Sequence, residues 1–279
     1  MLVNHGNPER MTRALREKAA ATEKFVLVET GGNHGFARGC NIGVERARGD
    51  LVLFLNPDAV LATGVASRLK QSADGLPGDA PWIIGARIVN PDGSEQRGGR
   101  RGELTPASAM VGFLGLDRFV PGMKSLHYER DPLTDTLMPV PVVSGAALLM
   151  PRAGFRELGG FDERYFLHVE DIDICRRVRE AGGSVWFEPR ADIVHFGGTS
   201  RTSPTFVETQ KGLGFIKYFW KFYTGPLERL TTMAMIVPIF AALWGRVAFL
   251  KLRRGVRNRR HRNRALRRLK RLRAHRASR

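Results

Sequence analysis

One stretch in the second half of the chain decides the fold. Residues 142–195 read VVSGAALLMPRAGFRELGGFDERYFLHVEDIDICRRVREAGGSVWFEPRADIVH. An apolar strand ends at Ser144-Gly145, and a second apolar segment follows from Ala146 to Met150. A helix is predicted from Glu170, because apolar residues then recur at helical spacing, and it ends at Gly182-Gly183.

The same stretch contains acidic side chains at the start of a predicted helix. Glu170, Asp171 and Asp173 occupy the first turn of the predicted helix, where the helix dipole favours negative charge. Val185–Phe187 is expected to be a strand that Pro189 ends, and Ile193 to His195 to begin another. Two carboxylates followed by a histidine could serve acid–base or metal chemistry. Helix capping and a histidine at a strand end explain the same residues.

The chain before this stretch alternates between strands and helices, which predicts an α/β domain with a mostly parallel sheet. The expected strands are Met1–Val3, Phe25–Val28, Leu51–Leu55 and Trp82–Ile88, and the expected helices are Glu9–Ala21, Arg38–Ala47 and Gly64–Ala73. Ligands of such sheets bind beyond the carboxyl ends of the strands, where Asp58 follows Asn56-Pro57. A turn aspartate after a proline is the alternative for Asp58.

These motifs together resemble the family-2 glycosyltransferases, of the inverting, rhamnosyltransferase-like type. The resemblance is carried by motifs in both halves of the chain: Asn33-x-Gly35-Phe36, Asn41-x-Gly43, Leu55-Asn56-Pro57-Asp58, Ser144-Gly145-Ala146, Gly159 to Glu163, Glu170 to Arg176, Pro189-Arg190-Ala191 and His195. It implies a GT-A type α/β fold, a mixed and mostly parallel sheet flanked by helices. It also implies transfer of a sugar, rhamnose being one candidate, from a nucleoside-diphosphate donor.

The resemblance implies a role for each candidate site residue. Asp171 would take the proton of the acceptor hydroxyl, and Glu170 would position or tune it. Asp58 and His195 would hold a divalent cation, Mg²⁺ or Mn²⁺, against the donor diphosphate. Asn33, Gly35 and Asn41 would line the donor pocket, although helix capping could explain them too. Arg176 would pair with the diphosphate or, as a structural ion pair, with Asp173.

The chain departs from the family pattern in two places. Asn56 stands at the first acidic position of the strand-end motif, so Asp58 alone carries its charge. Family members also usually open with another strand and helix before the segment that matches Met1 to Glu9. This late beginning predicts either a start upstream of Met1 or a shortened variant with weakened donor binding and an exposed sheet edge.

Charge is concentrated at one end of the chain. The formal net charge is +18, and residues 251–279 contain fifteen Lys or Arg and no acidic residue. The apolar run at 231–250 precedes this tail and is near the roughly 20 residues that span a bilayer. We therefore predict a catalytic domain at 1–225, a membrane-associating helix at 226–250 that spans or lies on the bilayer, and a polybasic tail at 251–279.

This organisation predicts the partners and the location. The acceptor is expected to be a glycan or a lipid-linked sugar in cell-surface polysaccharide synthesis, at the cytoplasmic, anionic inner face of the plasma membrane. Arg97, Arg100 and Arg101 are interpreted as a solvated basic loop, and Phe215, Tyr218, Phe219 and Phe222 as packing surface. Two alternatives remain: a catalytically inert, membrane-bound scaffold, and, less favoured, a nucleic-acid-binding protein that uses its tail.

Overall fold

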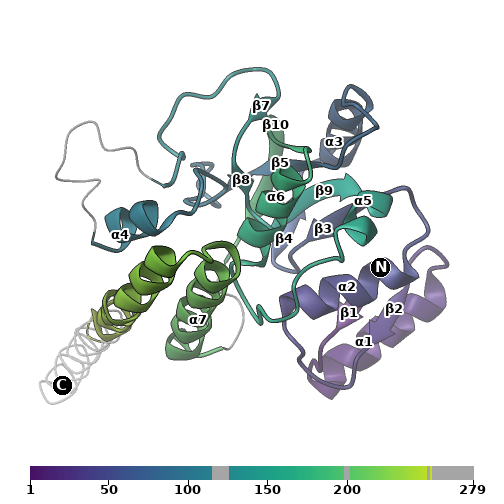
Figure 1. Ribbon diagram of the computed structural model, residues 1–279. Coiled ribbons are helices and arrows are strands. Elements are labelled where there is room, and N and C mark those ends of the chain that lie inside the picture. The colour runs from purple at the N-terminus through teal and green to yellow at the C-terminus, as the bar shows by residue number, and fades with distance from the viewer. Residues whose placement is uncertain (115–125, 198–201, 250–251, 253–279) are drawn as a thin grey trace, which may run out of the picture.

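The computed structural model of the chain describes residues 1–114, 126–197, 202–249 and Leu252. Its strands are β1 (Leu2–Asn4), β2 (Leu27–Glu29), β3 (Leu51–Leu55), β4 (Ala59–Leu61), β5 (Trp82–Val89), β6 (Arg100–Arg101), β7 (Met138–Pro139), β8 (Val142–Val143), β9 (Ala147–Pro151) and β10 (Ser184–His195). Its helices are α1 (Glu9–Ala21), α2 (Phe36–Arg46), α3 (Val65–Asp74), α4 (Pro106–Leu114), α5 (Arg152–Glu157), α6 (Glu170–Glu180), α7 (Pro204–Phe222) and an unlabelled C-terminal helix, Pro226–Phe249. Figure 1 shows their arrangement.

A six-stranded mixed sheet forms the centre of the molecule, with strand order β3-β9-β5-β10-β4 and β7 beside β10. The mixed sheet was predicted, but its strands are not mostly parallel: within it only β5 and β10 pair in parallel. The reason is that β9 inserts antiparallel between β3 and β5, whereas an alternation of strands and helices alone predicts neighbours that run the same way.

Strands β1 and β2 pair in parallel as a separate two-stranded ribbon. Helix α1 contacts β2, and α2 contacts β1. Strand β3 lies at an edge of the central sheet, where β9 is its one paired neighbour among the described strands.

Strand β10 is one continuous strand, which corrects the prediction that Pro189 separates two strands. Its pairing with β5 shifts register between Glu188 and Asp192. Pro189 lies inside this irregularity, where a missing backbone N–H costs no ladder hydrogen bond. The strand therefore continues past the proline and carries His195 to the edge where β3 also ends.

Helices cover both faces of the central sheet. Helix α3 contacts β5 and β10, and its buried residues Val65, Leu69 and Ala73 pack with Ile84 and Ile88 on one face. Helices α2, α5 and α6 contribute to the core on the other face. Phe54, Phe155 and Phe161 form an aromatic cluster there, with ring centroids 4.9 to 5.2 Å apart. Helix α6 is thus held against the sheet by apolar burial on one side.

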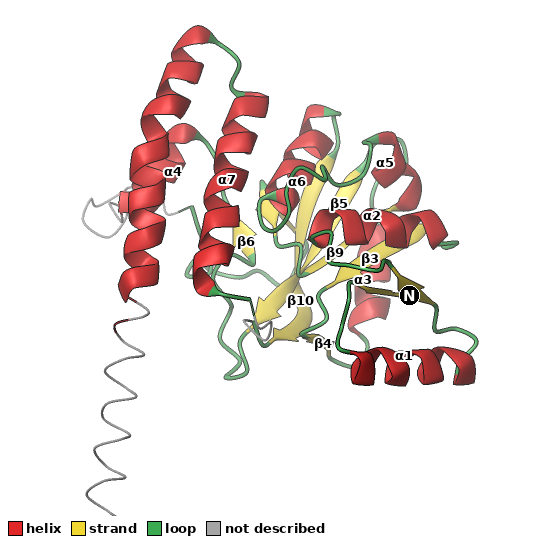
Figure 2. Cartoon of the chain, turned by 90° about the horizontal axis from the view of Figure 1, so that it is seen from below, coloured by secondary structure: helices red, strands yellow, loops and turns green. Residues whose placement is uncertain are grey.

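Helix α7 and the C-terminal helix run side by side as a hairpin (Figure 2). The aromatic residues Phe215, Tyr218 and Phe219 are at most 6% exposed, which confirms their interpretation as packing surface. Gly212 on α7 permits close approach, because a Cβ there would meet Leu243 at 2.9 Å and Phe240 at 3.1 Å. By length and composition the C-terminal helix is apolar enough to cross a membrane, with a mean hydropathy of 1.6.

Gly85 permits the central sheet to approach β8, the strand that leads into Ser144-Gly145. A Cβ on Gly85 would overlap the side chain of Val143, which is fully buried. We expect Gly85→Ala to lower the free energy of unfolding by about 1–3 kcal/mol through overpacking. The matched control is Gly78→Ala, where nothing lies within 4 Å of the added carbon. Equal denaturation midpoints for the two variants would contradict this packing.

Candidate functional site

Asp58 and His195 meet at the edge of the central sheet where β3 and β10 end. The Nε2 atom of His195 lies 3.0 Å from Oδ1 of Asp58 and 3.3 Å from the side-chain amide of Asn56. The backbone N–H of Phe196 also donates to the carbonyl of Asp58. The two predicted metal ligands are 137 residues apart in sequence and adjacent in space.

A second hydrogen bond orients the His195 ring. Its Nδ1 atom lies 2.6 Å from Oε1 of Gln96, whose amide nitrogen donates to the side chain of Asn90 and to the carbonyl of His195. Because the amide nitrogen is used in this way, Oε1 is the atom that faces the ring, so Nδ1 carries the proton. In the neutral ring, Nε2 then presents a lone pair toward the carboxylate of Asp58.

This arrangement fits a divalent cation. A lone pair that faces a carboxylate oxygen at 3.0 Å is unfavourable unless a proton or a metal ion lies between them. Two ligands that bind one cation at about 2.1 Å lie about 3 Å apart. A histidine that ligates a metal usually donates its other N–H to a fixed acceptor, as His195 does to Gln96.

Asp58 and His195 are the two side chains of this pair that could ligate a cation. Within the described ranges, no cluster of three or more His, Cys, Asp or Glu side chains could hold a metal ion. Mg²⁺ and similar ions are commonly bound in this way, by one or two protein groups together with substrate phosphates.

The second part of the site is the carboxylate of Asp171, at the N-terminus of α6. Its Oδ2 accepts hydrogen bonds from Arg101 at 2.5 Å and from the backbone N–H of Gly145 at 3.1 Å. Burial by itself would raise the pKa of Asp171, but the charge of Arg101 and the N–H of Gly145 outweigh it, so the pKa is lowered. Asp171 is therefore ionised at neutral pH, as a proton acceptor must be.

Glu170 is the neutral member of the acidic pair. Its side chain is 6% exposed, and Oε2 has no hydrogen-bond partner. Burial, and then the negative charge of Asp171, raise the pKa of Glu170 to about 8. The two adjacent carboxyl groups thus differ in charge state at pH 7, because Arg101 reaches one of them and not the other.

The backbone before this pair is strained. His168 and Val169 both have positive φ angles, 68° and 76°, which side chains with a Cβ rarely adopt. Such conformations cost about 1–3 kcal/mol each and persist where surrounding packing enforces them. Gly214 on α7 supplies that packing, since a Cβ there would meet Val169 at 2.9 Å and the carbonyl of His168 at 3.4 Å.

A short path connects the two parts of the site. The backbone N–H of Asn56 donates to the carbonyl of Ala146 at 3.0 Å. Ala146 is the neighbour of Gly145, whose N–H reaches Asp171. Gly145 also lies beside Phe36, because a Cβ on this glycine would be 3.3 Å from Asp171 and 3.7 Å from the Phe36 ring. The strand ends, the start of α2 and the start of α6 thus converge.

Gly35 and Asn33 shape the start of α2. Gly35 has a φ of 88°, and a Cβ there would contact the carbonyl oxygen of Phe166 at 2.5 Å. Asn33 accepts a hydrogen bond from the N–H of Gly35, which is a local turn. Gly35 thus lies next to Phe36 at the convergence described above. A donor-binding role for these two residues stays a prediction.

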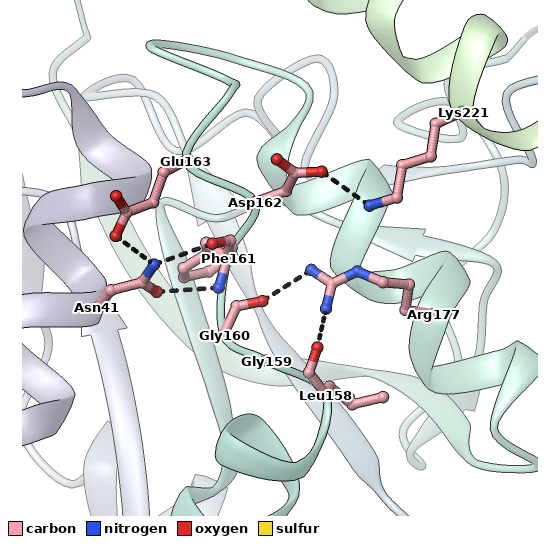
Figure 3. A pocket seen from close by; sticks show the side chains of 9 residues that line it. All are labelled: Asn41, Leu158, Gly159, Gly160, Phe161, Asp162, Glu163, Arg177 and Lys221. Carbon is pink, nitrogen blue, oxygen red and sulfur yellow. Dashed lines mark hydrogen bonds and ion pairs between the residues drawn. The ribbon is translucent and has the colours of Figure 1, made fainter.

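Asn41 lies in a different pocket, with a cavity of about 370 Å³ (Figure 3). Its side-chain amide exchanges two hydrogen bonds with the backbone of Phe161, both 2.9 Å long, and donates a third to Glu163. These contacts fix the loop after Gly159-Gly160. The structure therefore gives Asn41 a loop-holding role and does not bring it together with Asp58 or Asp171, and its donor-binding role stays a prediction.

The predicted ion pair between Arg176 and Asp173 is wrong. Asp173 pairs with Arg177 at 2.6 Å and with Lys221 of α7 at 2.6 Å, not with Arg176. Arg176 instead pairs with Glu180 and stacks on Phe222, with its guanidinium 4.3 Å from the ring centroid. Residues spaced four apart share a helix face, which explains both i, i+4 pairs.

The prediction of a solvated basic loop is wrong for two of its three arginines. Arg97 is half exposed, as predicted. Arg100 is 2% exposed, pairs with Glu95 at 2.8 Å and donates to the carbonyl of Asp131. Arg101 is 14% exposed and reaches Asp171. Both are enclosed because β6 pairs with β8. No local pattern marks Arg101, whose partner is 70 residues away.

Comparison with known proteins identifies the family. The profile of glycosyl transferase family 2 matches residues 1–156. The chain belongs to this family. The match covers β1 through α5 and includes Asp58, while the family resemblance of Glu170, Asp171 and His195 rests on their sequence motifs.

Two relatives extend the comparison. The N-acetylglucosaminyl-diphospho-decaprenol L-rhamnosyltransferase of Mycobacterium tuberculosis is 30% identical over 181 residues, 61% of this chain and 58% of that protein. The low-salt glycan biosynthesis hexosyltransferase Agl10 of Haloferax volcanii is 26% identical over 175 residues, 60% of this chain and 50% of that protein. The matched region thus spans between half and two thirds of these relatives.

Two solved structures share the fold. GalNAc-T7, solved with UDP, GalNAc and Mn²⁺, has a TM-score of 0.51 at 18% identity, over 80% of this chain and 42% of that one. The mannosyltransferase PcManGT of Pyrobaculum calidifontis, solved with GDP-Man and Mn²⁺, has a TM-score of 0.50 at 14% identity, over 91% and 69%. The predicted GT-A type fold is therefore confirmed.

The raised pKa of Glu170 predicts a pH dependence of stability. The folded protein keeps this proton up to pH about 8, whereas the unfolded chain loses it near 4.5, so the free energy of unfolding falls as pH rises between these values. Glu170→Gln removes the titratable proton and, with it, this contribution to the pH dependence of the free energy of unfolding. We expect urea denaturation across pH 5–8 to show a smaller decline for Glu170→Gln than for the wild type. Parallel curves would contradict the assignment.

Proposed function

We propose that this chain transfers a sugar from a nucleoside-diphosphate donor to a glycan or lipid-linked acceptor in cell-surface polysaccharide synthesis, with inversion at the sugar. The observation that carries the proposal is the ionised carboxylate of Asp171, which lies beside Gly145 at the convergence of the strand ends. Asp58 and His195 form the second pole of the same site. Membership of glycosyl transferase family 2 agrees with this chemistry.

Asp171 acts as the general base. A hydroxyl group is a weak nucleophile at neutral pH, so a positioned carboxylate must accept its proton as the oxygen attacks. The bond from the acceptor oxygen to the anomeric carbon forms while the bond from that carbon to the diphosphate oxygen breaks. The proton goes to Asp171, and the electron pair leaves with the diphosphate. A single displacement of this kind inverts the sugar.

Asp58 and His195 would hold a divalent cation, Mg²⁺ or Mn²⁺, next to the leaving diphosphate. When bound, the cation stabilises the charge that develops on the diphosphate. The hydrogen bond from His195 to Gln96 keeps the Nε2 lone pair directed at the Asp58 carboxylate. Both structural neighbours were solved with Mn²⁺ and a nucleotide or nucleotide sugar, which supports this assignment.

The relatives support the class of donor and acceptor. Their names describe rhamnosyl and hexosyl transfer, and one of them names a sugar linked through a diphosphate to decaprenol. We propose the same kind of acceptor for this chain, with rhamnose as one candidate sugar. We also propose a catalytic domain at 1–225, a membrane-associating helix at 226–250 and a basic tail at 251–279, with the reaction at the cytoplasmic face of the plasma membrane. The apolar C-terminal helix supports this organisation.

The deciding measurement is calorimetric titration of the full chain with UDP, GDP and dTDP, with and without Mn²⁺. We expect one of these nucleotides to bind only when Mn²⁺ is present. Asp58→Ala should lose this metal-dependent binding, because it removes a cation ligand. Asp171→Asn is the matched control: it should bind nucleotide like the wild type and lose transfer by about 10²–10⁴-fold. Absence of nucleotide binding to the wild type would favour the inert scaffold.

An exposed apolar face on the C-terminal helix supports attachment to a membrane. Its most exposed apolar residues are Leu227, Leu230, Met233, Val237, Trp244 and Phe249. The opposite face packs into the protein, where Ile239 and Leu243 are at most 3% exposed. A helix with one face committed to the protein and the other apolar and exposed favours a position on the bilayer surface. Contiguous exposed apolar surface of this kind marks interaction sites.

We expect the double variant Leu230→Asn, Val237→Asn to bind phosphatidylglycerol-containing vesicles at least about tenfold more weakly, because each apolar side chain contributes ~1.5–3 kcal/mol when buried. Met11→Asn, at a similarly exposed residue of α1, is the control. Vesicle co-sedimentation measures both. Removal of residues 251–279 should also weaken sedimentation. Unchanged sedimentation together with lost RNA retention would instead assign the tail to nucleic acid.

A further inference from the structure

The loop of residues 166–169 directly precedes Glu170 and Asp171, and α2 holds its first residue. The carbonyl oxygen of Phe166 accepts a hydrogen bond from the N–H of Phe36 at 3.0 Å. A Cβ on Gly35 would lie 2.5 Å from the same oxygen and 3.0 Å from the Phe166 ring, so this close approach requires a glycine. The start of the loop is therefore fixed against the N-terminus of α2.

Helix α7 holds the other end of the loop. A Cβ on Gly214 would lie 2.9 Å from Cγ2 of Val169 and 3.4 Å from the carbonyl oxygen of His168. The ring of Phe206, in the first turn of the same helix, packs edge-on against the ring of Phe166, with centroids 5.5 Å apart. The loop is thus enclosed between α2 and α7, and a side chain at position 214 would have to displace Val169.

The sequence of the loop does not favour the conformation that it adopts. Val169 is the N-cap of α6, with a φ of 76° and a ψ of −19°, in the left-handed region. Glycine adopts this conformation readily, whereas β-branched residues avoid it. The side chain of Val169 also makes no capping hydrogen bond, which Ser, Thr, Asp or Asn would supply at this position. The packing around Val169, which is 2% exposed, therefore imposes the conformation.

The position of Val169 determines where α6 begins. Its carbonyl accepts the N–H of Asp173 at 2.9 Å, which starts the hydrogen-bond ladder of the helix. Asp171 lies between these two residues, in the first turn, whose N–H groups have no partner inside the helix. Its Oδ2 accepts from the N–H of Gly145, at 3.1 Å, on a different segment of the chain. A shift of Val169 therefore moves the carboxylate of Asp171 relative to Gly145.

We propose that Gly214 is a positioning residue for the proton acceptor, because the room that it leaves for Val169 sets the place of the Asp171 carboxylate. This role rests on the proposed glycosyl transfer and adds to it a residue outside the acidic helix. A general base must lie within about 2.6–3.2 Å of the oxygen whose proton it takes. A misplacement of about 1 Å can slow a reaction by about 10²-fold. Asp58 and His195 lie on other segments, so Gly214 acts on the proton transfer and leaves the cation site unchanged.

The first measurement is hydrogen exchange of the Gly145 amide in the full chain, because this N–H is protected by its bond to Asp171. We expect Gly214→Ala to accelerate this exchange by about tenfold or more relative to the amides of β9, which report global stability. Gly212→Ala is the matched control. Its added carbon would lie equally close, at 2.9 Å, to Leu243 of the C-terminal helix and not to the loop, so Gly145 should exchange as in the wild type. Asp171→Ala gives the rate without the bond.

The second measurement is the release of nucleoside diphosphate from dTDP-rhamnose, UDP-N-acetylglucosamine and GDP-mannose, with Mn²⁺ and with water as the acceptor. The water oxygen bonds to the anomeric carbon, its proton goes to Asp171, and the diphosphate leaves with the electron pair. We expect Gly214→Ala to lower the rate at saturating donor by about 10–10²-fold and to bind the nucleoside diphosphate like the wild type. Gly212→Ala should preserve both the rate and the binding.

A second variant reaches the same contact from the loop and decides the question if Gly214→Ala does not fold. Val169→Gly removes the side chain that Gly214 meets and releases the constraint on the turn, since glycine adopts either sign of φ. The Gly145 amide should again exchange faster than in Gly212→Ala. Equal exchange in these two variants would contradict the positioning of Asp171 by this contact.

Three other outcomes overturn the positioning role. One is equal exchange of Gly145 in Gly214→Ala and Gly212→Ala. Another is faster exchange with an unchanged rate of hydrolysis, since the displacement would then not matter to the proton acceptor. The third is an equal loss of hydrolysis and of nucleotide binding, which would assign Gly214 to the stability of the whole site. Absence of nucleotide binding by the wild type would overturn the proposed function, whereas the exchange of Gly145 would still decide whether Gly214 positions Asp171.

Discussion

The arrangement of the site depends on one buried carboxylate, that of Asp173, which is 0% exposed. A charge so enclosed is tolerated only when it is fully paired, and removal of one partner from such a pair costs about 3–5 kcal/mol. Arg177 binds it from the same helix and also donates to the carbonyls of Leu158 and Gly160, while Lys221 binds it from α7. The acidic helix, the glycine-rich loop and the helix hairpin are therefore joined at one point.

This junction explains how strain is maintained in the two residues directly before Glu170 and Asp171. Because Lys221 fixes the far end of α7, Gly214 is pressed against His168 and Val169, whose backbone is left-handed. The strained turn directs Asp171 toward Arg101 and Gly145 and leaves Glu170 buried. The pKa values of the two neighbouring carboxyl groups therefore differ because burial and the charge of Asp171 act on Glu170, whereas Arg101 and the N–H of Gly145 stabilise the charge of Asp171.

Local sequence patterns predicted those structural features that depend on interactions between residues close in sequence. The sequence predicted the bounds of α1 and β3, the start of α6 and the proximity of Asp58 to His195. Periodicity, strand ends and motif resemblance mark these features. Three features could not be predicted, because each depends on pairing between distant segments. They are the insertion of β9, the continuity of β10 through Pro189 and the enclosure of Arg101. Arg176 and Arg177 were confused because adjacent residues lie on different helix faces.

Asp58 and Asp171, the two carboxylates of the candidate site, have different surroundings. At the carboxyl ends of β3 and β10, Nε2 of His195 lies 3.0 Å from the carboxylate of Asp58 and 3.3 Å from the side-chain amide of Asn56. In the proposed reaction, the general base must stay ionised although a negatively charged donor lies close to it. Arg101 meets this requirement, because it holds Asp171 in its charged form before either substrate arrives.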